Sequence, residues 1–168
     1  MLKAMKRIAM YAGTFDPITF GHLDIAQRAL GLFDEVVLAV AASEGKNPLF
    51  SLDERVALVE ESVRSLPETK RLRVESFSGL LVEHALSRNA CAVIRGLRAV
   101  SDFEFEFQLA LMNRKLNEKL ETLFLMPKES YTYLSSRIIK EISRLGGDIS
   151  PFVPPCVEQA LRKKIMAA

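Results

Sequence analysis

The chain has 168 residues, of which 49% are hydrophobic and 26% are charged. This size and composition suit a single globular domain over residues 1–168, and they exclude the disordered and fibrous classes. The formal net charge of +2 is too small for a typical nucleic-acid binder, so the anions that the protein binds should be small.

Cysteine usage and hydropathy favour a reducing, cytoplasmic location. The two cysteines, Cys91 and Cys156, are far apart and form no disulfide or zinc-ligand pattern. The first apolar stretch, residues 8–12, is too short for a signal sequence, and no run approaches the roughly 18 residues that span a bilayer. We expect a cytoplasmic protein without membrane contact, with residues 1–5 as a loose extension.

Short apolar runs rich in β-branched residues alternate with longer segments of helical period, which is typical of βαβ units. The predicted strands are residues 7–12, 35–42, 72–77, 92–95 and 122–126, and the predicted helices are 22–32, 52–66, 80–88, 102–116, 136–145 and 156–165. Because crossovers between parallel strands are right-handed, the fold class is α/β: a Rossmann-like, doubly wound, parallel five-stranded sheet flanked by helices. Ligands should bind beyond the carboxyl ends of its strands.

The first strand is followed by residues 13–22, Gly-Thr-Phe-Asp-Pro-Ile-Thr-Phe-Gly-His. This segment puts His22 in the first turn of a helix, where unpaired N–H groups and an imidazole can bind phosphate. The alternative is a tight turn with a capping histidine. Neither G-x-G-x-x-G nor a Walker A pattern occurs, which argues against an ordinary NAD site and a P-loop kinase.

Cations follow two further strands. Lys46, next to Gly45 and Pro48, could neutralise a phosphate as a point charge or could be a solvated lysine. Arg95 ends the fourth strand and Arg98 follows a glycine, so two guanidiniums suited to bidentate phosphate binding face the predicted ligand edge.

Hydroxyl groups follow the last strand, in residues 131–137, Tyr-Thr-Tyr-Leu-Ser-Ser-Arg. Serines at a helix start can bind an anion or simply cap the helix. All four of these segments fall at one edge of the predicted sheet, and a triphosphate substrate would need them all there. The residues alone therefore predict nucleotidyl transfer, without specifying the acceptor.

Two runs resemble known signatures. Residues 19–22, Thr-Phe-Gly-His, are similar to the [T/H]-x-G-H signature of the nucleotidyltransferase superfamily, and residues 134–140, Leu-Ser-Ser-Arg-Ile-Ile-Lys, resemble its second signature. Within that superfamily, residues 11–22, 94–105 and 124–127 resemble the phosphopantetheine adenylyltransferase family, and the resemblance covers residues 7–165. Arg137 departs from the serine common in this family, and Lys140 stands where the wider superfamily has arginine.

The resemblance implies a reaction of coenzyme A biosynthesis, in which the phosphate of 4'-phosphopantetheine attacks the α-phosphorus of ATP in line and pyrophosphate leaves. By resemblance, His22 would stabilise charge on the α-phosphoryl oxygens and Thr14 would hold a phosphate. Lys46 and Arg95 would bind the acceptor phosphate, with Leu81 near the pantetheine arm. Catalysis would be positioning plus electrostatics.

The resemblance also implies an ATP site, a metal and an assembly. The expected ATP-binding residues are Thr14, Phe15, His22, Gly96, Leu97, Arg98, Glu106, Tyr131, Thr132, Tyr133, Leu134, Ser135, Ser136 and Arg137. Mg²⁺ is expected with ATP, held mainly by phosphate oxygens and water. A homohexamer and feedback binding of coenzyme A are also expected, and one face of the helix that carries Phe103, Phe105 and Phe107 would meet another subunit.

Other functions stay open at this point. The nearest rival is another adenylyl- or cytidylyltransferase, acting on nicotinate mononucleotide or glycerol phosphate. A class I aminoacyl-tRNA synthetase shares the first signature, but the chain lacks the length for an anticodon-binding domain. A regulatory module that binds ATP without turning it over would tolerate the loss of His22, whereas an enzyme would not.

Overall fold

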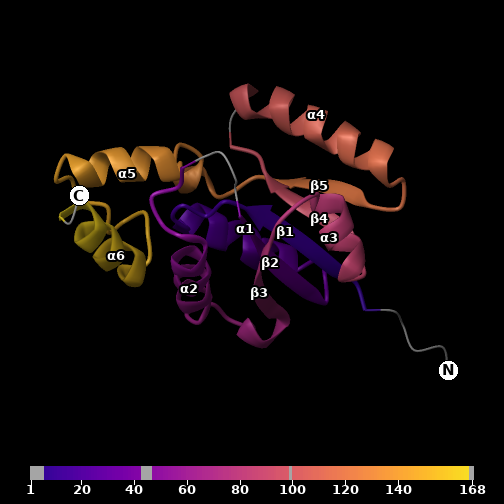
Figure 1. The fold of residues 1–168 in the computed structure, drawn as a ribbon, viewed down its shortest axis with the longest axis horizontal. Helices are drawn as coiled ribbons and strands as arrows, with labels where there is room; N and C mark the ends of the chain where they lie inside the picture. Colours follow the sequence, from indigo (N-terminus) through magenta and orange to yellow (C-terminus); the bar gives the residue numbers. More distant parts are fainter. Residues whose placement is uncertain (1–5, 43–46, 99, 167–168) are drawn as a thin grey trace.

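The computed structural model describes residues 6–42, 47–98 and 100–166, with 100–102 described by their backbone only. The elements, in chain order, are β1 (Ile8–Gly13), α1 (Phe20–Leu30), β2 (Glu35–Ala41), α2 (Leu52–Val63), the short 3₁₀ helix η1 (Thr69–Arg71), β3 (Leu72–Phe77), α3 (Leu81–Ser87), β4 (Ala90–Gly96), α4 (Val100–Leu116), β5 (Glu121–Leu125), η2 (Glu129–Tyr131), α5 (Ser136–Arg144) and α6 (Pro155–Met166). Figure 1 shows their arrangement.

The five strands form one parallel sheet in the order β3-β2-β1-β4-β5. The strand order reverses between β1 and β4, because the chain first builds outward through β2 and β3 and then returns to the other side of β1. The predicted fold class is confirmed, and each predicted strand is present within two residues of its expected ends. A doubly wound sheet binds its ligands at this switch point.

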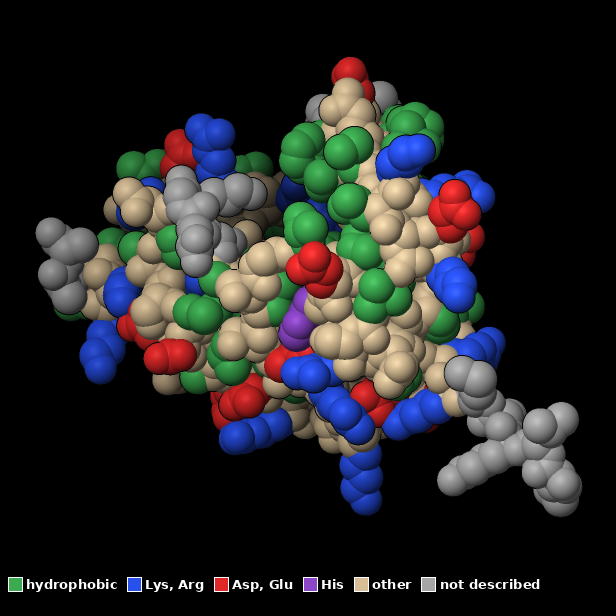
Figure 2. Space-filling view, turned by 45° about the vertical axis from the view of Figure 1, so that its right-hand side comes forward, with side chains coloured by type: hydrophobic (Ala, Val, Ile, Leu, Met, Phe, Trp, Pro, Cys, Tyr) green, Lys and Arg blue, Asp and Glu red, His purple; other side chains and the backbone are tan. Residues whose placement is uncertain are grey.

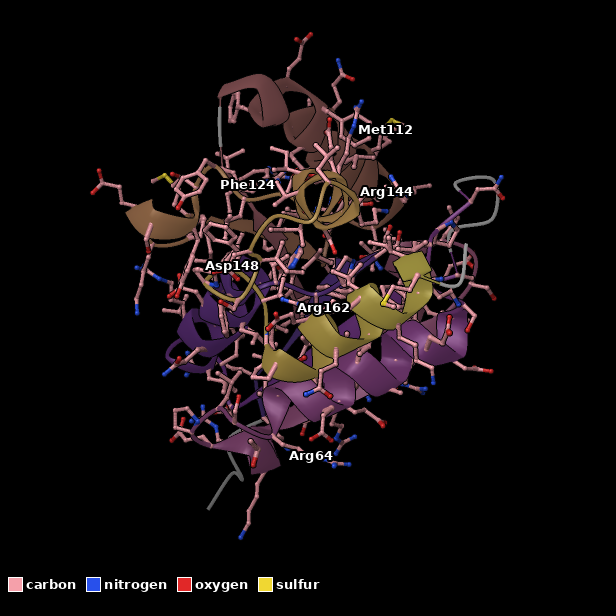
Figure 3. All side chains as sticks on the ribbon, turned by 90° about the vertical axis from the view of Figure 1, so that its left-hand side faces the viewer. Arg64, Met112, Phe124, Arg144, Asp148 and Arg162 are labelled. Atoms are coloured by element: carbon pink, nitrogen blue, oxygen red, sulfur yellow. The ribbon has the colours of Figure 1, made fainter. Side chains whose placement is uncertain are left out.

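Side chains alternate along the strands, so the sheet has two apolar faces. On β1, Ala9 and Tyr11 face the larger core, which α1, α2, α5 and α6 cover. Met10 and Ala12 face the smaller core, which includes Val82 and Ala85 of α3. On the first side, α6 lies along α2 (Figure 3), and Lys164 of α6 donates to Glu54 of α2 at 2.7 Å.

Two helix starts differ from the sequence prediction by two residues, and two others, those of α3 and α6, by one. The first helix begins at Phe20, two residues early, because Thr19 is its N-cap. The fourth begins at Val100, so Ser101 lies inside the helix rather than before it. None of the helices in the described ranges combines the length and hydropathy needed to cross a membrane.

Candidate active site

A cavity of about 500 Å³, here named cavity A, opens at the switch point of the sheet. Its wall is built by the turn after β1, the first turn of α1, the end of β4 and the start of α5. Residues from these elements that line it include Thr14, Asp16, His22, Arg95, Gly96, Arg98, Glu106, Ser135, Ser136 and Lys140. The N-terminal ends of α1 and α5 both meet the cavity, and each brings unpaired N–H groups and partial positive charge. Cavity A is therefore suited to a polyanion.

His22 closes the first turn of α1 through a capping box. The backbone N–H of Thr19 donates to Nδ1 of His22 at 3.0 Å, and the backbone N–H of His22 lies 3.5 Å from Oγ1 of Thr19. Because Nδ1 accepts a hydrogen bond, the hydrogen-bond network assigns the ring proton to Nε2. His22 thus has one nitrogen fixed by the helix and one N–H available to a ligand.

The surroundings of His22 keep its ring neutral. Burial, together with the positive charge of Arg98, lowers the pKa of His22 from 6.5 to about 4. The rings of Phe15 and Tyr11 lie beside it, with centroids 5.2 Å and 6.4 Å away. At neutral pH the imidazole is therefore a hydrogen-bond donor and not a cation.

The turn after β1 is held in an uncommon conformation. Phe15 has a φ of 47°, in the left-handed region that non-glycine residues seldom adopt, and its side chain is 2% exposed. A Cβ on Gly13 would lie 3.0 Å from the Phe15 ring, so glycine is needed for this packing. The turn thereby places Phe15 in the wall of cavity A with its ring packed inside the protein.

Arg95 is held by Glu106 of α4. Its Nε and Nη2 each donate to one oxygen of the Glu106 carboxylate at 2.6 Å, and Nη1 donates to the carbonyl of Ala12 at 3.1 Å. A guanidinium has five N–H groups, so two stay available for a phosphate while the plane of the group is fixed. Both oxygens of Glu106, predicted to bind ATP, accept from Arg95.

The start of α5 supplies hydroxyl groups. Ser135 is the N-cap, and its oxygen accepts from the backbone N–H of Ile138 at 3.1 Å, which leaves its own proton for a ligand. Ser136 donates to the carbonyl of Pro17 at 2.7 Å, which joins α5 to the turn after β1. Arg98 is anchored here too, because it donates to the carbonyl of Leu134 at 2.7 Å.

A buried ion pair connects the same two segments. Asp16, which is 5% exposed, pairs with Lys140 of α5 and accepts from the backbone N–H groups of Leu49 and Phe50 at 3.0 and 2.9 Å. Burial alone would raise the pKa of Asp16, but Lys140 and the two N–H groups outweigh it and hold the pKa below 3.8. Lys140 is thereby held against cavity A.

A second hollow of about 530 Å³, cavity B, adjoins the first. Its lining is mostly apolar and comes from the ends of β2 and β3, the start of α3 and one side of α4: Ala41, Ala42, Phe77, Ser78, Gly79, Leu81, Phe105 and Leu109. Ala12, Gly13, Thr14 and Arg95 line both cavities. Figure 2 shows the surface hollowed beside α4, which projects at the top.

Most of the predicted site residues are brought together. Thr14, Phe15, His22, Gly96, Arg98, Glu106, Tyr131, Leu134, Ser135, Ser136 and Arg137 line cavity A, Leu81 lines cavity B, and Thr14 and Arg95 line both. Leu97, Thr132 and Tyr133 lie outside both walls; the Leu97 N–H continues the ladder to Leu125, and Tyr133 is 61% exposed. Lys46 lies outside the described residues. The roles of all these residues remain predictions.

Sequence reasoning missed the charged groups that support the site. Asp16 and Lys140 are 124 residues apart, so no local pattern pairs them. Arg55 reads as an ordinary surface residue of an amphipathic helix, yet it is 1% exposed. Asp16 and Lys140 each lie within one of the runs quoted above, but no motif includes Arg55.

Direct metal ligation by the protein has little support in the described ranges, where no group of three or more His, Cys, Asp or Glu side chains could hold an ion. The two carboxylates that line cavity A are Asp16 and Glu106, which are engaged by Lys140 and Arg95. This donor set fits a cation that reaches the cavity already bound to phosphate oxygens.

A cavity at the switch point with two helix N-termini is suited to binding a nucleotide. Comparison with known proteins identifies the class of protein. The cytidylyltransferase-like family model matches residues 10–142. A solved structure with the same fold, a putative nicotinate-nucleotide adenylyltransferase from Vibrio parahaemolyticus, aligns over 96% of this chain and 95% of its own with a TM-score of 0.69 and 21% identity. The chain is a nucleotidyltransferase of the cytidylyltransferase-like family.

Curated relatives narrow the class. The phosphopantetheine adenylyltransferase of Syntrophotalea carbinolica is 57% identical over 95% of this chain and 94% of the relative. That of Geobacter metallireducens is 53% identical over 95% and 96%. The chain therefore belongs to the phosphopantetheine adenylyltransferase family, as the sequence motifs predict.

Proposed function

We propose that this enzyme transfers AMP from ATP to 4'-phosphopantetheine, giving dephospho-coenzyme A and pyrophosphate. The observation that carries the proposal is that cavity A, polar and lined by two helix N-termini, adjoins the apolar cavity B at Thr14 and Arg95. The names of the curated relatives support the choice of acceptor. ATP occupies cavity A, and the pantetheine arm occupies cavity B.

The transfer is a single displacement at the junction of the cavities. An oxygen of the acceptor phosphate attacks the α-phosphorus, the bond from that phosphorus to the bridging oxygen breaks, and pyrophosphate leaves with the electron pair. Thr14 and Arg95 line both cavities, so they can hold the acceptor phosphate beside the α-phosphate. Such positioning is a large part of catalysis when little covalent work falls to the protein.

His22 stabilises the transition state by donating its Nε2 proton to an α-phosphoryl oxygen. The contact of Nδ1 with the Thr19 N–H fixes this tautomer, and the lowered pKa keeps the ring from becoming a cation at neutral pH. A donor held in advance by a helix loses little in reorganisation when charge develops. His22 acts neither as a base nor as a nucleophile in this account.

The β- and γ-phosphates bind at the start of α5. The hydroxyl of Ser135, the Arg98 guanidinium and the ammonium of Lys140 lie at or near this end of cavity A. Mg²⁺ would come with ATP, bound to its phosphates, and would supply charge neutralisation to the leaving pyrophosphate. Arg137, exposed at the rim of the cavity, adds a further cation to this side.

The test is pyrophosphate release by the purified protein with ATP and Mg²⁺, run in parallel with 4'-phosphopantetheine, nicotinate mononucleotide and no acceptor. Release that depends on phosphopantetheine, with dephospho-coenzyme A identified by mass, is the expected result. Release with nicotinate mononucleotide instead would keep the chemistry and refute the acceptor. Binding of ATP without release in any arm would favour a regulatory module.

We further propose that the protein is a cytoplasmic homohexamer and that coenzyme A inhibits it by feedback. Hydrophobic side chains gather on α4 in Figure 2, and Phe105, Leu111 and Met112 are more than half exposed. A contiguous apolar surface of this kind favours burial against other subunits.

Coenzyme A contains the pantetheine arm and can occupy cavity B. Light scattering and a coenzyme A titration of the assay test the assembly and the feedback.

A further inference from the structure

Arg55 is a buried cation that none of the steps above uses. It lies in the first turn of α2, directly after Glu54 of the capping box, and is 1% exposed. A cation is disfavoured there twice, because the N-terminal end of a helix carries partial positive charge and because burial removes the charge from water. Burial accordingly lowers the pKa of its guanidinium, and the field of Asp16 acts against this shift. Strong contacts must compensate for both costs.

Those contacts are four backbone carbonyl groups. Nη1 donates to the carbonyls of Thr14 at 2.8 Å and Ala41 at 2.7 Å, Nη2 donates to that of Ala42 at 3.2 Å, and Nε donates to that of Phe50 at 3.2 Å. The four oxygens belong to three chain segments: the turn after β1, the end of β2 and the residues just before α2. One guanidinium therefore ties together segments that are distant in the sequence.

The position of these carbonyls explains why a bridge is needed. Adjacent parallel strands are joined by backbone hydrogen bonds only as far as their ladder extends, and the last pair between β1 and β2 is Gly13 with Val40. Thr14 and Ala41 are the next residue on each strand, and Arg55 joins them through one nitrogen. The side chain continues the connection between the strands beyond the end of the ladder.

The bridged residues form part of the wall of cavity B. Thr14, Ala41 and Ala42 line it, and Arg55 itself lines neither cavity. The guanidinium thus lies behind this wall and fixes the separation of the two strand ends. Arg55 contributes less to the wall of cavity A, since Thr14 is the one bridged residue that also lines that cavity.

From this geometry we infer that Arg55 is a positioning residue for the acceptor, holding the ends of β1 and β2 at the spacing that cavity B requires. The inference rests on the proposed function, because it takes cavity B as the groove for phosphopantetheine. Its consequence is a selective effect: a change at Arg55 weakens acceptor binding and leaves ATP binding nearly intact.

The test compares Arg55→Lys and Arg55→Met with wild type, using calorimetric binding of 4'-phosphopantetheine without ATP and steady-state KM values for both substrates. Lysine keeps the charge but cannot donate in the four directions that the guanidinium spans. We expect the dissociation constant of phosphopantetheine to rise about tenfold in Arg55→Lys, because the ends of β1 and β2 lose the bridge that fixes their spacing. The KM for ATP should stay within about twofold, well below that tenfold loss.

Arg71→Lys is the matched control. Arg71 also donates to backbone carbonyls, those of Leu30, Phe33 and Asp34, but at the opposite end of the sheet, where β2 and β3 begin. The Arg71→Lys variant should have a lower melting temperature, without a selective effect on the binding of either substrate. If Arg55→Met does not fold, the inference is tested with Arg55→Lys alone, and its melting curve shows that this variant is folded.

Unchanged phosphopantetheine binding in folded Arg55→Lys would overturn the inference, and so would equal losses for both substrates or the same acceptor effect in Arg71→Lys. These outcomes are distinct from a failure of the proposed function, which the wild-type assay decides. If wild type uses another acceptor, the same comparison is made with that acceptor.

Discussion

Cavities A and B lie side by side at the carboxyl edge of one sheet, yet their linings differ in chemistry. Cavity A is lined by helix N-termini and by charged groups in fixed hydrogen bonds, such as Arg95 on Glu106 and Lys140 on Asp16. Cavity B is lined mainly by alanine, leucine and phenylalanine side chains. A triphosphate needs donors that are fixed before it binds, whereas an extended, largely uncharged arm needs an apolar groove. The difference predicts that substitutions on the two sides separate the two substrates.

The largest effect is expected for His22→Ala, in cavity A. Removing a fixed donor to developing charge costs about 3 kcal/mol, so kcat should fall by roughly 100-fold or more, while the lost cap on Thr19 should lower stability by about 1 kcal/mol. Steady-state kinetics at saturating ATP and acceptor measure this. His84→Gln, at the other histidine of the chain, should retain near wild-type kcat, and equal losses in the two variants would refute the role of His22.

The second-largest effect is expected for Lys140→Met, at a residue that lines cavity A. The variant removes a cation held at the start of α5, so the KM for ATP should rise about tenfold while that of phosphopantetheine changes little. The control is Lys163→Met, which makes the same substitution at an exposed position of α6. A larger effect on the acceptor than on ATP would contradict the division between the cavities.

Leu81→Asp tests the apolar side. Position 81 is the first residue of α3, where an aspartate favours the helix and offsets part of the packing against the smaller core that Leu81 provides, so a melting curve accompanies the kinetics. A carboxylate in cavity B should raise the KM for phosphopantetheine by about fivefold to tenfold, because the pantetheine arm would then have to bury a charge. Leu80→Asp, one residue earlier and 51% exposed, should leave that KM unchanged.

A separate prediction concerns protonation and stability rather than kinetics. The pKa of His22 lies near 4 in the folded protein and 6.5 is its ordinary value, so between these pH values the unfolded chain binds more protons. The free energy of unfolding should therefore fall as pH drops from about 6.5 toward 4. An NMR titration of the two histidines checks this directly, and a His22 ring that becomes charged near pH 6.5 would contradict the neutral donor.

The fold could be predicted almost completely, because strands buried on both sides and helices of clear period leave strong local patterns. Thr19 and His22 illustrate the limit. The two interpretations of His22, a helix cap and a phosphate ligand, looked like alternatives, but the structure shows that Nδ1 caps the helix while Nε2 stays available. Local sequence cannot assign separate roles to the two nitrogens of one ring.

The supporting charges could not be predicted for a different reason. Arg55 and Asp16 act through contacts with the backbone of segments far along the chain, and such contacts depend on tertiary placement rather than on residue type. The extra length of β4 at its start, Ala90 and Cys91, likewise reflects pairing with β1 more than its own pattern. The motifs thus included many of the side chains that line the two cavities and missed Arg55, which lies behind the wall of cavity B.

Direct transfer of AMP between the adjoining cavities can be tested by the exchange of labelled pyrophosphate into ATP. The enzyme is incubated with ATP, Mg²⁺ and labelled pyrophosphate, with and without 4'-phosphopantetheine. Direct displacement predicts that label enters ATP only when phosphopantetheine is present. Label entering ATP without any acceptor would contradict the account, because it would require AMP to be held covalently by the enzyme.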